Sequence, residues 1–206
     1  MLRLYFADVS ALDPDSFSGI LTDYRREKLS RQRNAQSRRQ SLGAELLLRQ
    51  ALADCAPERP WPPEIRLGEY GKPTWNAEGL YFNLSHSGEL AACVIADRPV
   101  GLDVQKTCVY REALAKRFFT PEEQELLAVS EERDQDFGRI WAMKESYLKA
   151  RGDGLARPLS SFSVVGKGRE RLDAAFWYCR LQGYHFAVCV PGADAAEPDI
   201  IVKKLP

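Results

Sequence analysis

The chain has 206 residues and is 45% hydrophobic, which is enough for the core of one domain or of two small ones. Its five cysteines form no CxxC pair and no apolar run approaches a membrane span, which argues against a disulfide frame, a zinc site and a membrane protein. The 29 basic and 29 acidic residues balance, but Tyr24 to Gln50 holds eight Lys or Arg against two acids, whereas Glu122 to Asp136 holds seven acids. Such a basic segment suits a polyanionic ligand or an acidic partner.

The N-terminus reaches an acid within eight residues and has no signal-peptide core. We therefore expect a soluble cytoplasmic protein with reduced thiols. The first half is predicted to start with a strand at Leu2–Val9, followed by a helical region that carries the basic segment. A solvated helix face is the plainer interpretation of those charges. The prolines between Pro57 and Pro63 exclude regular structure there and predict a connecting loop.

Alternation and short apolar runs then predict four strands: Ile65–Leu67, one beginning at Leu80, Leu90–Ala96 and Val100–Gln105. In the second of them, Asn83 and Ser85 share one face, whereas His86 lies on the other with the apolar side chains. A lone histidine in that position is more often structural than functional.

The strand that ends at Gln105 carries polar side chains where a core strand is expected. Val104 and its apolar neighbours at alternate positions point one way, whereas Asp103 and Gln105 point the other way, with Cα atoms roughly 6.6 Å apart. A carboxylate on such a strand needs a partner. Oxygen ligands without clustered His or Cys favour Mg²⁺ or Mn²⁺ over zinc, although two such residues alone are a weak metal signal.

The second half is predicted to contain one helix that starts with Thr120 as N-cap and another that ends near Gly152 and Gly154. The second helix has an apolar stripe that includes Lys144, with Glu145 at its edge and Lys149 one turn further on. Snorkelling of Lys144 and a surface pair of Glu145 with Lys149 are the plainer interpretation. Four strands are predicted in this half: Ser161–Val165, Ala175–Leu181, Tyr184–Val190 and Ile200–Lys203.

Both halves place a helix before a small antiparallel sheet. The sequence therefore predicts an α+β fold of two similar subdomains related by a pseudo-twofold axis, residues 1–101 and 102–206, with the second carrying the metal and catalytic motifs. A ligand site between the subdomains is the natural expectation.

Four short motifs follow one another in the order and approximate spacing found in one enzyme family. They are Tyr70-Gly71-Lys72-Pro73, Phe82-Asn83-Leu84-Ser85-His86-Ser87, Val100-Gly101-Leu102-Asp103-Val104-Gln105 and Trp141-x-x-Lys144-Glu145-Ser146-x-x-Lys149. Together with the basic Arg25–Lys28 and the tail Gly152–Phe162, the chain resembles the surfactin-type 4′-phosphopantetheinyl transferases over about two-thirds of its length.

The resemblance implies an enzyme that moves the 4′-phosphopantetheine arm of coenzyme A onto a serine of an apo acyl, peptidyl or polyketide carrier protein, with Mg²⁺, releasing 3′,5′-ADP. It implies catalytic roles for Glu145 and Lys149, and metal binding by Asp103, Gln105 and Glu145. The coenzyme-binding residues that it implies are Lys28, Arg39, Lys72, Pro73, Ser85, His86, Asp103, Lys144 and Lys149. We expect a monomer that contacts neither nucleic acid nor a membrane.

Gln105 departs from the family pattern, which has Glu two residues after the metal-binding Asp. A neutral amide remains an oxygen ligand but brings one negative charge less. This departure is the only support for an alternative, a non-catalytic homologue that binds coenzyme A or the carrier. A nucleic-acid binder is a second alternative, but no aromatic stacking platform accompanies the basic segment.

Overall fold

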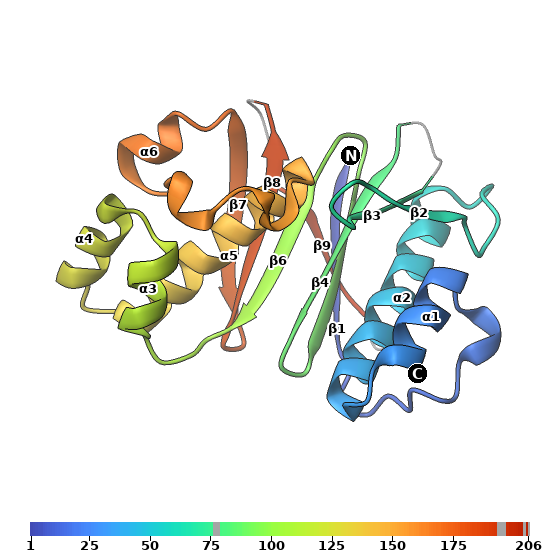
Figure 1. Cartoon of the computed structure of the whole chain (residues 1–206). Helices are drawn as coiled ribbons and strands as arrows, with labels where there is room; N and C mark the ends of the chain where they lie inside the picture. The colour runs from blue at the N-terminus through green and yellow to red at the C-terminus, as the bar shows by residue number, and fades with distance from the viewer. Residues whose placement is uncertain (76–78, 193–196, 204, 206) are drawn as a thin grey trace.

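Two small sheets lie next to each other at the centre of the molecule, and helices cover the outer face of each (Figure 1). The computed structural model describes residues 1–75, 79–192, 197–203 and 205. The first sheet has the strand order β4-β5-β1-β9 and the second has the order β6-β8-β7, while β2 and β3 form a separate hairpin. In chain order the strands are Leu2–Asp8, Ile65–Leu67, Pro73–Trp75, Tyr81–Ser87, Leu90–Ala96, Gly101–Lys106, Ala174–Leu181, Tyr184–Pro191 and Asp199–Val202.

The helices α1 to α6 are Asp23–Arg31, Ala35–Cys55, Glu112–Phe118, Pro121–Val129, Arg133–Arg151 and Gly166–Glu170. Three short 3-10 turns are Ser18–Ile20, Gly154–Ala156 and Leu159–Ser161. No helix in the described part of the chain combines the length and hydropathy that crossing a membrane requires.

Local sequence signals account for the helix ends in the second half. At the start of α4, Thr120 Oγ1 accepts a hydrogen bond from Glu123 N and the Glu123 carboxylate accepts one from Thr120 N, which is a capping box. At the end of α5, Gly152 adopts a left-handed conformation with φ of 79°, which glycine takes without steric cost. Both predicted boundaries are confirmed.

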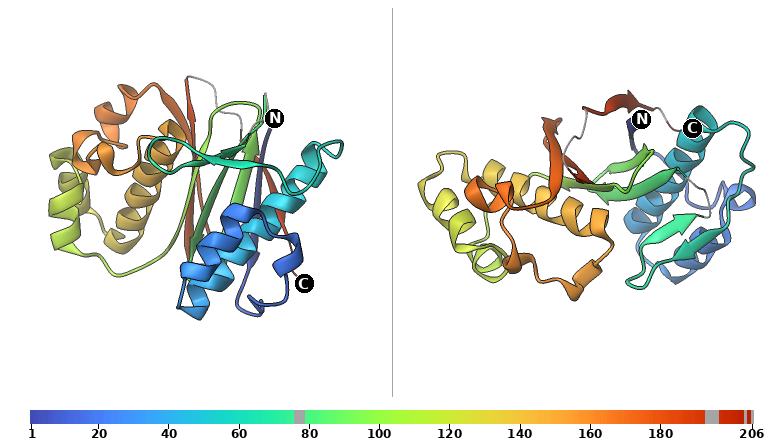
Figure 2. Two further views of the ribbon diagram at one scale, coloured as in Figure 1. Left: turned by 45° about the vertical axis from the view of Figure 1, so that its right-hand side comes forward. Right: turned by 90° about the horizontal axis from the view of Figure 1, so that it is seen from above.

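Three apolar clusters hold the layers together. The first lies between α2 and the outer face of the first sheet, and the second between α5 and the outer face of the second sheet. The third lies between the sheets and draws residues from β1, β5, β6 and β8. The result is a helix–sheet–sheet–helix arrangement, which the turned views of Figure 2 follow from the side and from above. The predicted α+β class is confirmed.

Helix α5 lies unusually close to β6 because a glycine stands at the contact. A Cβ atom on Gly101 would lie 2.0 Å from the carbonyl oxygen of Ser146, a separation that real Cβ atoms do not reach. The helix backbone therefore rests almost directly on the strand. This approach brings the side chains of the last two turns of α5 next to Asp103, two residues further along β6.

The structure corrects three details of the sequence prediction. The predicted strand Ser161–Val165 is wrong: a 3-10 turn ends at Ser161, and the backbone N–H of Val164 donates to a side chain instead of a strand neighbour. The predicted helical region around the basic segment is two helices, α1 and α2, because the chain turns at residues 32–34. The first sheet is not purely antiparallel, since β9 pairs parallel with β1.

The last correction also bears on the subdomains. The predicted boundary between residues 101 and 102 falls at the start of β6, yet β9 returns from the second half to the edge of the first sheet. The division into residues 1–101 and 102–206 stays a prediction, and β9 crosses it.

Candidate functional site

A ladder of side-chain hydrogen bonds joins the two sheets where β4 runs beside β6. Alternate backbone N–H groups of β6 donate to alternate side-chain oxygens of β4. The pairs are Leu102 N to Asn83 Oδ1 at 2.9 Å, Val104 N to Ser85 Oγ at 3.0 Å and Lys106 N to Ser87 Oγ at 3.0 Å. These bonds satisfy the backbone donors along the edge of the second sheet, so the polar face predicted for β4 becomes the seam between the sheets.

Asp103 is the centre of the site. Its Oδ1 accepts hydrogen bonds from Ser85 Oγ at 3.0 Å and from Lys149 Nζ at 2.6 Å. Its Oδ2 is buried and has no hydrogen-bond partner among the described residues. Burial raises the pKa of this carboxyl, and Lys149 and Ser85 oppose that effect. One carboxylate oxygen is thus fixed by the protein, while the other is a buried acceptor without a partner among the described residues.

Glu145 and Lys149 reach the same place from α5. Burial raises the pKa of the Glu145 carboxyl, and the nearby Asp103 carboxylate raises it further. Two carboxylates that repel each other in a half-buried site favour a bound cation. Gln105 follows Asp103 by two residues on the same face of β6, as predicted, and its side chain is half-buried.

The donor set fits a hard divalent cation. Across the described residues, no three His, Cys, Asp or Glu side chains form a cluster that could hold a metal ion. An ion bound at this site would have two carboxylates, Asp103 and Glu145, and the amide oxygen of Gln105 as its protein ligands. Such a set suits Mg²⁺, which is commonly held by one or two carboxylates together with substrate phosphates and waters. The buried Oδ2 of Asp103 is the observation that favours this use of the site.

Lys28 and Arg25 of the first half form a positive rim near Lys149, together with His86. Lys28 on α1 has a pKa lowered by burial and by the charges of Arg25 and Lys149. The side chain of His86 reaches solvent, but the surrounding protein and the charges of Lys28, Lys149 and Arg25 lower its pKa to about 4. The histidine is therefore neutral at pH 7 and offers a hydrogen bond, whereas the lysines offer charge.

Arg39 is another predicted coenzyme-binding residue in the first half of the chain. Arg39 is in the second turn of α2, and its buried Nε has no partner in the part of the chain that the structure describes. The neighbouring Gln40 donates to the carbonyl of Gly88 at 2.8 Å, which ties this end of α2 to the β4–β5 turn beside His86. Arg39 thus has an unused donor on the helix that flanks the rim.

Lys72 fastens the turn before β3 to the second half. Its ammonium donates to the carbonyl oxygens of Val100 at 3.2 Å and Ala150 at 3.1 Å, and burial lowers its pKa to about 8. A cavity of about 300 Å³ opens between this turn and the end of α5. It is lined by Tyr70, Gly71, Lys72, Pro73, Asn83, Leu84, Glu145, Leu148, Lys149, Gly152 and Gly154. The cavity therefore contacts residues of three of the four sequence motifs.

Lys144, which was predicted to contact the coenzyme, is enclosed within the protein. Its ammonium is fully buried, pairs with the buried carboxylate of Glu123 at 2.6 Å and donates to the carbonyl of Phe162. A group enclosed in this way does not reach a ligand in the cavity. The predicted coenzyme contact of Lys144 is therefore corrected to an internal ion pair.

Sequence reasoning missed several members of this arrangement. Ser87 accepts the third hydrogen bond of the ladder. Its spacing of two residues from Ser85 places it on the same face of the strand and could have indicated this role. Tyr70 lines the cavity but stands within a turn motif in which only Lys72 and Pro73 were predicted to bind. Arg25 was predicted only as part of the basic segment, yet it is buried and paired with Glu45 at 3.1 Å. That pair links α1 to α2, and no local sequence pattern predicts it.

Sequence comparisons with known proteins agree on one family. A sequence model of the 4′-phosphopantetheinyl transferase superfamily matches residues 99–189. A 4′-phosphopantetheinyl transferase of Bacillus subtilis is 35% identical over 76% of this chain and 71% of its own length. The 4′-phosphopantetheinyl transferase Sfp of Bacillus subtilis strain 168 is 31% identical over 95% of this chain and 93% of its own. A crystal structure of Thermotoga maritima holo-acyl-carrier-protein synthase matches 46% of this chain and 62% of that chain, with 21% identity and a TM-score of 0.39.

Proposed function

Because the chain belongs to the 4′-phosphopantetheinyl transferase superfamily, we propose that it transfers the 4′-phosphopantetheine arm of coenzyme A to a serine of an apo carrier protein. The observation that carries this proposal is the buried Oδ2 of Asp103, which has no partner among the described residues, in a carboxylate that lies beside Glu145 and Lys149. A pyrophosphate and its cation need this combination of carboxylates and ammonium groups.

The reaction forms one bond and breaks one. The serine hydroxyl oxygen attacks the phosphorus that carries pantetheine, and the bond from that phosphorus to the bridging oxygen of 3′,5′-ADP breaks. The serine proton leaves to a base, and negative charge builds up on the departing phosphate. Burial and the Asp103 carboxylate raise the pKa of Glu145, which makes it a better proton acceptor, and Lys149 would supply positive charge to the phosphates.

Asp103, Glu145 and Gln105 are the residues that would hold Mg²⁺ or Mn²⁺. When bound, the ion would neutralise the charge that the pyrophosphate oxygens carry and develop. The coenzyme would lie across the seam between the sheets, with Ser85, His86, Lys28 and Arg39 toward its phosphates. Lys72 and Pro73 would border it in the cavity.

The direct test is incubation of the protein with coenzyme A, Mg²⁺ and a panel of apo acyl, peptidyl and polyketide carriers, read by intact mass. One phosphopantetheine on one carrier serine is the expected product. No mass gain on any carrier class with folded protein would overturn the proposal. Tight Mg²⁺-dependent coenzyme binding without transfer would favour the non-catalytic alternative, for which the named relatives offer no support. We further propose a cytoplasmic monomer.

Replacing Lys28 by alanine is expected to weaken coenzyme A far more than dephospho-coenzyme A. A hydrogen bond between charged groups contributes roughly 1.5–3 kcal/mol, so the loss for coenzyme A should be tenfold or more if Lys28 holds the 3′-phosphate. Calorimetric titration with both ligands measures it. Arg31→Ala is the matched control, because Arg31 is exposed on the same helix and pairs with Glu27. Equal losses of affinity for both ligands would show that Lys28 is only a solvated charge and does not hold the 3′-phosphate.

Gln105→Glu is expected to lower the Mg²⁺ concentration for half-maximal rate, by up to about tenfold, with little change in the maximal rate. The substitution adds a carboxylate to a site that already has two, and 1.4 kcal/mol of added attraction corresponds to that factor. Gln105→Ala should reduce the rate of transfer only modestly. If Gln105→Glu instead created activity that the natural chain lacks, the non-catalytic alternative would be right.

A further inference from the structure

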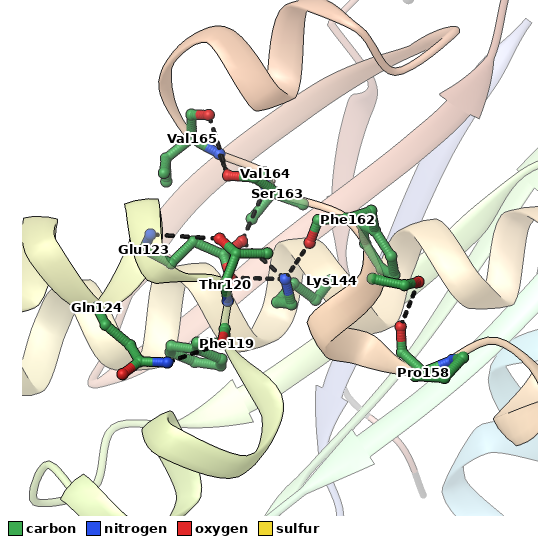
Figure 3. A network of polar contacts seen from close by, with 11 residues as sticks. Phe119, Thr120, Glu123, Gln124, Lys144, Pro158, Phe162, Ser163, Val164 and Val165 are labelled. Atoms are coloured by element: carbon green, nitrogen blue, oxygen red, sulfur yellow. Dashed lines mark hydrogen bonds and ion pairs between the residues drawn. The ribbon is translucent and has the colours of Figure 1, made fainter.

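Figure 3 shows the fully buried ion pair between Lys144 and Glu123, neither of which lines the cavity. Lys144 Nζ donates to Glu123 Oε2 at 2.6 Å and to Oε1 at 2.8 Å, and neither side chain has any exposed surface. In Figure 3 the lysine points from α5 toward the first turn of α4 and toward the chain around Phe162. Nothing in the proposed reaction uses this pair directly.

Both partners have their hydrogen-bonding capacity filled by groups from three segments. Glu123 Oε2 also accepts from Thr120 N at 2.8 Å, and its Oε1 accepts from Val164 N at 2.9 Å. The lysine also donates to the carbonyl of Phe162, whose ring centroid is 4.6 Å from the ammonium. The pair therefore joins α4, α5 and the segment 162–165 at a single point with defined geometry.

Such a pair is a poor source of stability but a precise constraint on geometry. The cost of removing two charges from water offsets much of their attraction, and apolar replacements of similar volume are often tolerated. What apolar side chains do not supply is a fixed direction, because their contacts are non-directional. The ammonium of Lys144 donates to three acceptors at once. This requirement fixes the rotation of α5 about its axis and its position along that axis.

The reactive side chains are on the same helix as Lys144 and come shortly after it in the sequence. Glu145 is the next residue, about 100° further around α5, and Lys149 is one turn beyond it. On the strand side, the glycine at position 101 lets α5 approach closely but provides no directional contact. A small rotation of α5 would move Glu145 and Lys149 away from Asp103, whose own position is fixed by β6 and Ser85.

We propose that Lys144 and Glu123 are positioning residues, whose buried pair sets the rotation of α5 so that Glu145 and Lys149 point at Asp103. The inference rests on the proposed function for its catalytic consequence. It assigns a role to two residues that have no contact with the cavity.

The test is the double variant Glu123→Gln with Lys144→Met, which removes both charges together and leaves no unpaired buried ion. The amide retains an acceptor for a backbone N–H, and the thioether side chain has nearly the volume of the lysine. The matched control is Ile140→Val, which removes a methyl group from a fully buried position one turn earlier on α5. Unfolding in urea, transfer kinetics and calorimetric Mg²⁺ binding in the presence of coenzyme A are measured for both variants.

The double variant is expected to unfold at a urea concentration no lower than the control, yet to lose roughly 10²-fold in kcat, the effect of displacing reactive groups by about 1 Å. KM for coenzyme A should change less than kcat, because most of the assigned coenzyme contacts are in the first half of the chain. Mg²⁺ affinity should fall, whereas the control should keep both kcat and Mg²⁺ affinity.

A double variant that matches the control in kcat and in Mg²⁺ affinity would overturn the positioning role. Failure of the proposed function is recognised separately, because the unaltered protein would then transfer to no carrier. The Mg²⁺ titration still tests the geometry of Asp103 and Glu145 in that case. A fall in Mg²⁺ affinity confined to the double variant would uphold the positioning role.

Discussion

Glu145→Gln is expected to abolish measurable transfer while the fold and coenzyme binding remain. Loss of a general base costs roughly 10²–10⁴-fold in rate, and this residue is also assigned to the metal. Its carboxyl is half-buried next to Asp103, in an environment that raises its pKa and so makes it a better proton acceptor. An amide keeps an oxygen for the cation but accepts no proton. The time course of carrier modification, followed by intact mass, measures the loss.

The matched control is Glu125→Gln, because Glu125 is an exposed acid on α4. It should transfer at the normal rate. Calorimetry should find coenzyme A bound to the Glu145→Gln variant with an affinity close to that of the unaltered protein. A Glu145→Gln variant with near-normal rates would show that Glu145 is neither the base nor a needed metal ligand.

The strand residues of the site were predictable because a strand alternates its side chains with a period of two. The pattern of β4 placed Asn83 and Ser85 on one face, and the pattern of β6 placed Asp103 and Gln105 on one face, as the structure has them. The hydrogen bonds between β4 and β6 use that face of β4 and the backbone N–H groups of Leu102 and Val104. Alternation does not say which strands become neighbours, so the ladder itself was not predicted.

The role of Lys144 was out of reach for a related reason. Helix periodicity correctly placed the lysine in the apolar stripe of α5, but a stripe faces whatever packs on it. A ligand and an internal carboxylate are both partners that a buried ammonium accepts. The partner, Glu123, is 21 residues away in the sequence. Its place in the first turn of α4 could be predicted from the sequence, but its pairing with Lys144 could not. The parallel pairing of β9 with β1 joins segments from opposite ends of the chain. It was not predicted, because a local pattern does not identify a distant partner.

Asp103→Asn is expected to reduce transfer by at least about 100-fold and to weaken Mg²⁺ binding in the presence of coenzyme A. Outer-shell partners of metal sites already contribute roughly 10–100-fold, and Asp103 is assigned as a direct ligand. The substitution keeps the volume of the side chain and one oxygen that can accept from Ser85. The fold should therefore persist, which an unfolding curve in urea would verify.

Ser85→Ala gives a graded comparison for the same carboxylate. The serine hydroxyl donates to Asp103 Oδ1 and accepts from Val104 N, so its loss leaves the carboxylate in place but less firmly oriented. Transfer by Ser85→Ala should fall by roughly 10-fold, between the natural chain and Asp103→Asn. If Asp103→Asn were the milder of the two, the carboxylate would serve only as the partner of Lys149. The unpaired Oδ2 of Asp103 would then have no part in metal binding.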